Sequence, residues 1–175
     1  MTCLAGCTAM VDHWVRSAAE YHAWVEQQVA YVGGYWEHTP DYVEYPVEST
    51  GAIELETVLE VQNPTRIILP DDFRLDVRFT VLFREYAVDV LSYRYHLSAE
   101  GRPQVWRYDK HKKSDFEKKH GTDCHLHTEH GTIEPTPLVD FDEVVLRALA
   151  ETGRPAPPGP ALWIPGAAPD PRGSL

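Results

Sequence analysis

The residues best suited to chemistry are the histidines and charged side chains between Tyr93 and Ile133. Six of the nine histidines lie in this stretch: His96, His111, His120, His125, His127 and His130. Imidazole titrates near neutral pH, so one ring can accept a proton while another donates one. A buried core seldom holds so many imidazoles, because each needs a hydrogen-bond partner or water. We therefore expect any catalytic site to lie here.

The segment 104–111 predicts a strand that carries a cation, a carboxylate and an imidazole on one face. Alternate residues of a strand point to the same side, so Arg107, Asp109 and His111 form a row with neighbours about 6–7 Å apart. Such a row supplies the parts of a general acid–base site. The alternative is a solvated sheet face with cross-strand ion pairs, because salt bridges use the same residue types.

A local excess of positive charge follows the row. From Arg102 to Lys119 there are seven Lys/Arg against three Asp/Glu, whereas the chain as a whole has a net charge of −11. The excess predicts an anionic ligand or, alternatively, a basic loop that is only solvated. The overall charge argues against a protein that coats nucleic acid over its whole surface. We expect five residues to bind substrate: Arg94, His96, Tyr108, Lys112 and Lys113.

The segment 124–130 has two interpretations. As a strand, it points His125 and His127 to one side, where paired imidazoles can act on a reacting group. Alternatively, Cys124, His127 and His130 hold a zinc ion. Zinc motifs normally combine two well-separated ligand pairs, which this segment lacks, so we expect no metal or other cofactor.

A histidine pair suits the cleavage of RNA. One imidazole removes the proton of the 2′-hydroxyl, the other protonates the leaving 5′-oxygen, and an arginine or lysine stabilises the dianionic transition state. No metal is required. The residues expected to act in this way are His111, His125, His127 and Arg107, with Asp109 to orient a histidine or pair with Arg107.

The elements that position these residues follow from hydrophobic periodicity. The spacing over 11–32 predicts an amphipathic helix that ends at Gly33 and Gly34. Residues 35–51, rich in aromatics and carboxylates, predict a surface connector, and 52–62 a first strand. Strict alternation over 73–83 predicts a strand with one buried face.

The remaining elements complete an α+β fold. Short connections from 73–83 to strands at 86–97 and 104–111 predict an antiparallel meander. A helix begins at Asp140, which forms a capping-box pattern with Glu143. We expect a sheet with the N-terminal and C-terminal helices packed on it.

At these residues the sequence resembles the TumE-type toxins of bacterial toxin–antitoxin modules. The shared order is Tyr-x-Tyr-His from Tyr93, Trp-Arg-Tyr-Asp from Trp106, a polar loop, His-x-His from His125 and a closing helix. The resemblance covers about residues 73–150. It implies a small α+β domain and a growth-inhibiting toxin that acts on RNA and is neutralised by a cognate antitoxin.

Carried over by position, Arg107, Tyr108 and Asp109 match the family's Arg-Tyr-Asp element, and His125 and His127 match its histidine segment. The sequence departs from the family by about 70 added residues at the front, by a proline-rich tail, and in three places within the motifs. Lys110 replaces an asparagine, the loop is lysine-rich without proline, and Cys124 precedes the histidines. The alternatives are a non-catalytic binding module and a zinc-binding hydrolase.

The chain divides into three expected parts. Residues 1–72 hold the N-terminal helix, the connector and the first strand, 73–152 form the toxin-like core, and 153–175 form a flexible Pro/Gly-rich tail. Three cysteines are too few for a disulfide scaffold, and no apolar run is long enough to cross a membrane. We expect a soluble cytoplasmic protein without membrane contacts.

Overall fold

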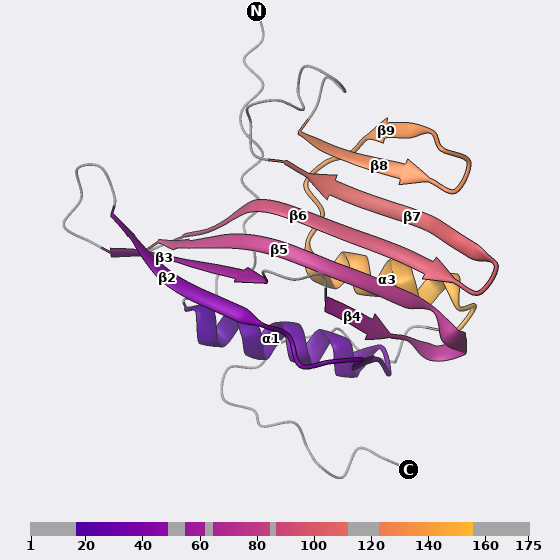
Figure 1. The fold of residues 1–175 in the computed structure, drawn as a ribbon, viewed down its shortest axis with the longest axis horizontal. Coiled ribbons are helices and arrows are strands. Elements are labelled where there is room, and N and C mark those ends of the chain that lie inside the picture. The colour runs from indigo at the N-terminus through magenta and orange to yellow at the C-terminus, as the bar shows by residue number, and fades with distance from the viewer. Residues whose placement is uncertain (1–16, 49–54, 62–64, 85–86, 112–122, 156–175) are drawn as a thin grey trace, which may run out of the picture.

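The computed structural model is an α+β fold in which one antiparallel sheet carries two helices on one face (Figure 1). The structure describes residues 17–48, 55–61, 65–84, 87–111 and 123–155. The helices are α1 (Ala18–Tyr31), the 3-10 helix η1 (Pro70–Asp72) and α3 (Phe141–Glu151). The strands are β1 (Tyr35–Trp36), β2 (Tyr42–Glu48), β3 (Leu55–Val61), β4 (Thr65–Ile68), β5 (Arg74–Arg84), β6 (Ala87–Ala99), β7 (Arg102–Lys110), β8 (Cys124–Thr128) and β9 (Ile133–Pro135). The expected fold class is confirmed.

The strands pair in the order β1-β4-β5-β6-β7-β8-β9. Strands β5 to β9 form a meander, each antiparallel to the next, as expected for the first three of them. Gly101, with a φ of +70°, makes the tight turn between β6 and β7, because a residue without Cβ tolerates this conformation. The long strand β5 pairs along its other edge with two short strands, β4 near its start and β3 near its end.

Residues 35–51, expected as an irregular connector, contain β1 and β2. Strand β2 pairs with β3 over seven residues despite Pro46. In the described part of the chain β2 has no second neighbour, and a proline is tolerated on such an edge strand. The aromatic and acidic residues of β2 do not alternate clearly between apolar and polar, so the sequence pattern does not predict this strand.

The C-terminal helix begins with its N-cap at Asp140, as expected, but the caps of both helices differ from the expectation. Helix α1 starts at Ala18, because Ser17 has an extended backbone and caps the helix. The Ser17 Oγ accepts a hydrogen bond from the Glu20 N–H at 3.2 Å. Residues 11–16 of the expected helix lie outside the described residues. The predicted capping box of α3 is absent. Asp140 is the N-cap residue without a side-chain capping bond, and the Glu143 N–H donates to Asp142 Oδ1 at 2.8 Å.

The core lies between the helices and one face of the sheet. Phe79 of β5 packs against Tyr21 of α1 and Phe141 of α3, with ring centroids 5.5 and 6.4 Å away. Phe141 also contacts Trp24 of α1 and Tyr95 of β6. Because one ring of α3 touches α1 and two strands, both helices cover the same face.

The opposite face, here called the open face, is polar. On β5 the buried Leu75, Val77 and Phe79 alternate with charged residues, and the registers of the neighbouring strands continue this division. No described helix covers this side. The open face is made of Arg66, Arg74, Asp76, Arg78, Arg94, His96, Ser98, Arg107, Asp109, His125 and His127.

Candidate functional site

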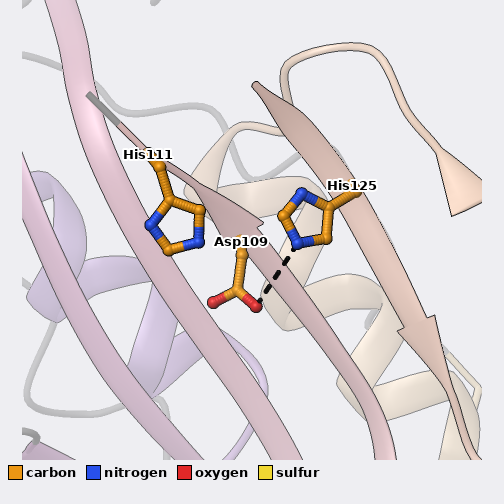
Figure 2. Close-up of side chains that lie close together, drawn as sticks. All are labelled: Asp109, His111 and His125. Carbon is orange, nitrogen blue, oxygen red and sulfur yellow. Dashed lines mark ion pairs between the residues drawn. The ribbon is translucent and has the colours of Figure 1, made fainter. Parts of the chain in front are cut away.

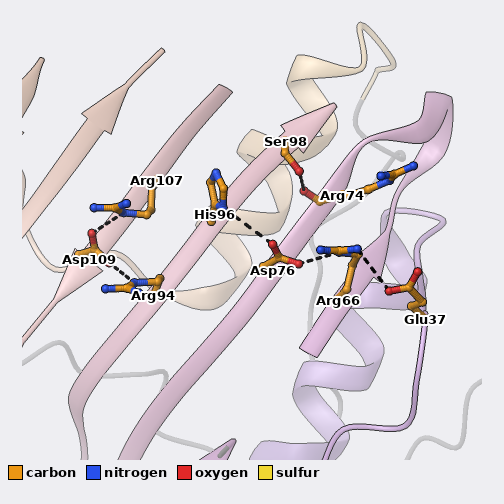
Figure 3. Close-up of polar contacts among 9 residues, drawn as sticks. All are labelled: Glu37, Arg66, Arg74, Asp76, Arg94, His96, Ser98, Arg107 and Asp109. Atoms are coloured by element: carbon orange, nitrogen blue, oxygen red, sulfur yellow. Dashed lines mark hydrogen bonds and ion pairs between the residues drawn. The ribbon is translucent and has the colours of Figure 1, made fainter. Parts of the chain in front are cut away.

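The centre of the open face is a carboxylate shared by two arginines. Arg94 Nε on β6 donates to Asp109 Oδ1 at 2.9 Å, and Arg107 Nε on β7 donates to Oδ2 at 2.7 Å (Figure 3). The Asp109 side chain is only 1% exposed. Burial raises the pKa of Asp109, but the hydrogen bonds and charges of the two arginines outweigh it and hold the pKa below its ordinary value. Asp109 is therefore a buried anion at neutral pH.

His127 lies against both members of this ion pair. Strand β8 places it directly opposite Arg107, and its Nε2 is 2.8 Å from Arg107 Nη2 and 3.2 Å from Asp109 Oδ2. A guanidinium only donates, so the contact with Arg107 requires a lone pair on Nε2. A protonated Nε2 would instead donate to Asp109. The two contacts are thus alternatives, and the protonation of one nitrogen selects between them.

Two further histidines complete the cluster (Figure 2). His125 Nε2 is 3.8 Å from Asp109 Oδ2, and the His125 ring packs edge-on against His127 with centroids 4.8 Å apart. His111, directly after β7, stacks on His125 at 5.7 Å. The His125 side chain is 0% exposed, whereas that of His127 is 15% exposed. A substrate can therefore contact His127, while His125 supports the cluster from inside.

Asp109, His111 and His125 form the one group in the described chain with the spacing of a metal site. Each offers a ligand atom, and these atoms lie within 4.8 Å of one another. Three such ligands fit a catalytic zinc ion. However, Asp109 already binds two guanidinium groups, and a divalent cation would lie beside them. The charge of the site therefore favours an anion.

Other expected site residues lie elsewhere. The structure does not bring the proposed zinc ligands Cys124, His127 and His130 together: strand alternation turns Cys124 to the helix side and His127 to the open face, and His130 is in the exposed turn after β8. Tyr108, expected to bind substrate, also faces the helices, where it is buried and bonded to Arg147 of α3. Lys112 and Lys113 lie outside the described residues.

A second group of charged residues adjoins the cluster (Figure 3). Asp76 Oδ1 accepts from Arg66 Nε at 2.7 Å, and Asp76 Oδ2 is 3.8 Å from Nδ1 of His96. Sequence reasoning missed Arg66 and Asp76. The outward position of Asp76 in the alternating segment 73–83 was the available signal, but only the register shows that it lies opposite His96.

Comparison with known families identifies the family of the chain. The family model described as Toxin TumE matches residues 40–154. The chain belongs to the toxin TumE family. The match confirms the resemblance and extends it towards the N-terminus to include β2, β3 and β4. The matched range contains every residue of the two groups described above, whereas α1 and β1 lie outside it.

TumE is a toxin family of toxin–antitoxin systems, so membership of this family implies an antitoxin as partner. No curated protein and no solved structure gave a significant match. Among the described helices, none is long and apolar enough to cross a membrane. Three of the residues carried over from the family, Arg107, Asp109 and His127, meet in a single network of contacts.

Proposed function

We propose that this TumE-family chain is the toxin of a toxin–antitoxin module and inhibits growth in the cytoplasm as a metal-independent ribonuclease. The observation that carries the proposal is the position of His127. Its Nε2 lies between a permanent cation, Arg107, and a buried anion, Asp109, on a sheet face that no described helix covers. An imidazole held in this way can exchange a proton with a substrate at its other nitrogen.

Arg107 links substrate binding to the state of His127. Guanidinium groups bind phosphate strongly through paired hydrogen bonds. When Arg107 Nη2 turns to a phosphate, Nε2 of His127 loses that donor and can carry a proton directed at Asp109, 3.2 Å away. Nδ1 then holds the lone pair and accepts the proton of a 2′-hydroxyl. Asp109 is the positioning residue, because it orients the ring and stabilises the imidazolium that forms.

The charges of the open face support a phosphate substrate. Arg94 and Arg107 are 54% and 29% exposed, so both keep guanidinium surface for a ligand beyond their bonds to Asp109. Arg78 on β5 lies directly opposite Arg94.

The test compares the wild type with His127→Gln, Arg107→Lys and the control His130→Gln, which changes an exposed histidine of the same hairpin. Each protein is induced in a bacterial host while growth and total RNA are followed, and the purified proteins are assayed on RNA with and without chelator. We expect arrest and RNA loss for the wild type and the control, a loss of about 100-fold or more in cleavage for His127→Gln, and no effect of chelator.

Three outcomes would overturn the proposal. Arrest without RNA loss means a different target, and full toxicity of His127→Gln removes this site from the mechanism. Cleavage that needs a stoichiometric metal favours a hydrolase with a metal at Asp109, His111 and His125. A folded wild type that neither arrests growth nor cleaves RNA supports the non-catalytic binding module.

A further inference from the structure

Arg107 lies between two histidines in one row across the sheet. The registers pair it with His96 on β6 and with His127 on β8. Neighbouring strands are about 4.8 Å apart, so the backbones of the two histidines are about 10 Å apart with that of Arg107 midway. A phosphate bound by the Arg107 guanidinium above this row would lie between the two imidazoles.

Each of these histidines has its own carboxylate, and each carboxylate is held by an arginine. Asp109 is 3.2 Å from His127 Nε2 and bonded to Arg107. Asp76 is 3.8 Å from His96 Nδ1 and bonded to Arg66. In Figure 3, His96 lies between Asp76 on one side and Arg107 on the other. The site thus has two carboxylate–histidine pairs around one phosphate-binding cation.

Exposure distinguishes His96 from His125 as the second reacting imidazole. The His96 side chain is 28% exposed, nearly the same as Arg107, whereas His125 is 0% exposed. Nε2 of His96 is itself shielded from solvent and has no hydrogen-bond partner in the described part of the chain, so a substrate oxygen can reach it only after the side chains that cover it move. An unmet buried ring nitrogen is unfavourable, and a bond to a substrate oxygen would offset that cost.

We propose that His96 is the second proton-transferring residue of this site and that Asp76 is its positioning residue, an inference that rests on the proposed ribonuclease function. His127 takes the 2′-hydroxyl proton while the 2′-oxygen forms a bond to phosphorus. The P–O5′ bond breaks, and His96, protonated, gives its proton to the 5′-oxygen. The products are a 2′,3′-cyclic phosphate and a 5′-hydroxyl end, and no water, metal or other reactant is consumed.

The experiment uses the full-length protein and single-stranded RNA, with kcat/KM measured across pH. The charged groups that face His96 are Asp76 from β5, Arg107 from β7 and Arg94 on its own strand. Because the acid must be protonated, His96→Gln should lower kcat/KM by about 100-fold or more and remove the alkaline fall of the profile. Asp76→Asn should lower kcat with little change in KM, because the imidazole loses the carboxylate that orients it.

Two comparisons separate chemistry from folding. His22→Gln is the matched control, since His22 also pairs with a carboxylate, Glu26 at 3.2 Å, but on α1. A nucleotide phosphodiester with a 4-nitrophenol leaving group needs no acid. His96→Gln should therefore cleave it at nearly the rate of the wild type, whereas His127→Gln should not, because the base is still required.

The outcomes for the two proposals differ. If the wild type does not cleave RNA, the ribonuclease function fails and this inference fails with it. If His127→Gln is inactive but His96→Gln keeps a two-sided pH profile, only the inference about His96 fails. A change confined to KM, or a defect that the activated substrate does not correct, would also remove His96 from proton transfer.

Discussion

Asp109 is the residue on which the charge of the site depends. Its carboxylate accepts hydrogen bonds from two arginines and lies 3.2 and 3.8 Å from the ring nitrogens of two histidines. The Asp109 side chain itself is almost fully buried. A buried anion is tolerated only when such partners replace its hydration. The same partners would become an uncompensated group of cations if the carboxylate were lost.

Asp109→Asn should therefore destabilise the protein by about 1–3 kcal/mol at pH 7, because a neutral amide loses the charge-assisted hydrogen bonds of two partly exposed arginines. The folded-state pKa of Asp109 is lowered, so its contribution to the free energy of unfolding is complete above about pH 4 and is lost as pH falls through the folded value. Urea unfolding at pH 7, 5 and 3.5 should show a steeper loss on acidification for the wild type than for the variant.

The control for this measurement is Asp71→Asn. The pKa of Asp71 is also lowered, by its hydrogen bond with Arg154, but both side chains are more than half exposed. Exposed ion pairs contribute little, so we expect hardly any change in unfolding free energy or in its pH dependence. Equal behaviour of the two variants would show that the burial of Asp109 has no energetic consequence.

At the scale of elements, alternation in the sequence predicted most of the framework. Strict alternation predicted the strand at 73–83, and short connections predicted those at 86–97 and 104–111. The two-residue period of a strand correctly turned Arg107 and Asp109 to one face, and His125 and His127 to the same side as each other. Alternation does not give register, because a shift of two residues keeps every side chain on its face. The contacts of Arg107 with His127, and of Asp76 with His96, therefore required the structure.

Phe141 is the largest of the buried side chains by which helix α3 packs on the sheet. Phe141 contacts aromatic rings of α1, β5 and β6 and is fully buried. Phe141→Ala should lower the free energy of unfolding by about 3–5 kcal/mol, because the transfer energy is lost and a cavity remains. Chemical unfolding would measure this. Tyr35→Ala is the control, since Tyr35 is 62% exposed and its loss should change stability by about 0.5 kcal/mol or less.

For the whole molecule, the distribution of charge matters more than its sum. The chain carries a net charge of −11, yet three arginines of the open face, Arg78, Arg94 and Arg107, lie in the rows beside Asp109. A polyanion such as RNA is repelled by the average charge and attracted by this one face. The helix-covered side offers no comparable row of cations among the described residues, so binding should be restricted to the open face.

The salt dependence of RNA binding tests this restriction. Each phosphate contact on a single strand contributes about 0.7 to the slope of log affinity against log salt. Arg74 and Arg78, two open-face arginines of β5 outside the proposed reacting groups, should each supply one contact. The double variant Arg74→Gln/Arg78→Gln should then bind single-stranded RNA with a slope smaller by about 1.4. Arg154→Gln should keep the slope of the wild type, because Asp71 already neutralises Arg154 at 2.9 Å. An equal reduction in both variants would mean that RNA responds to the total charge of the molecule rather than to this face.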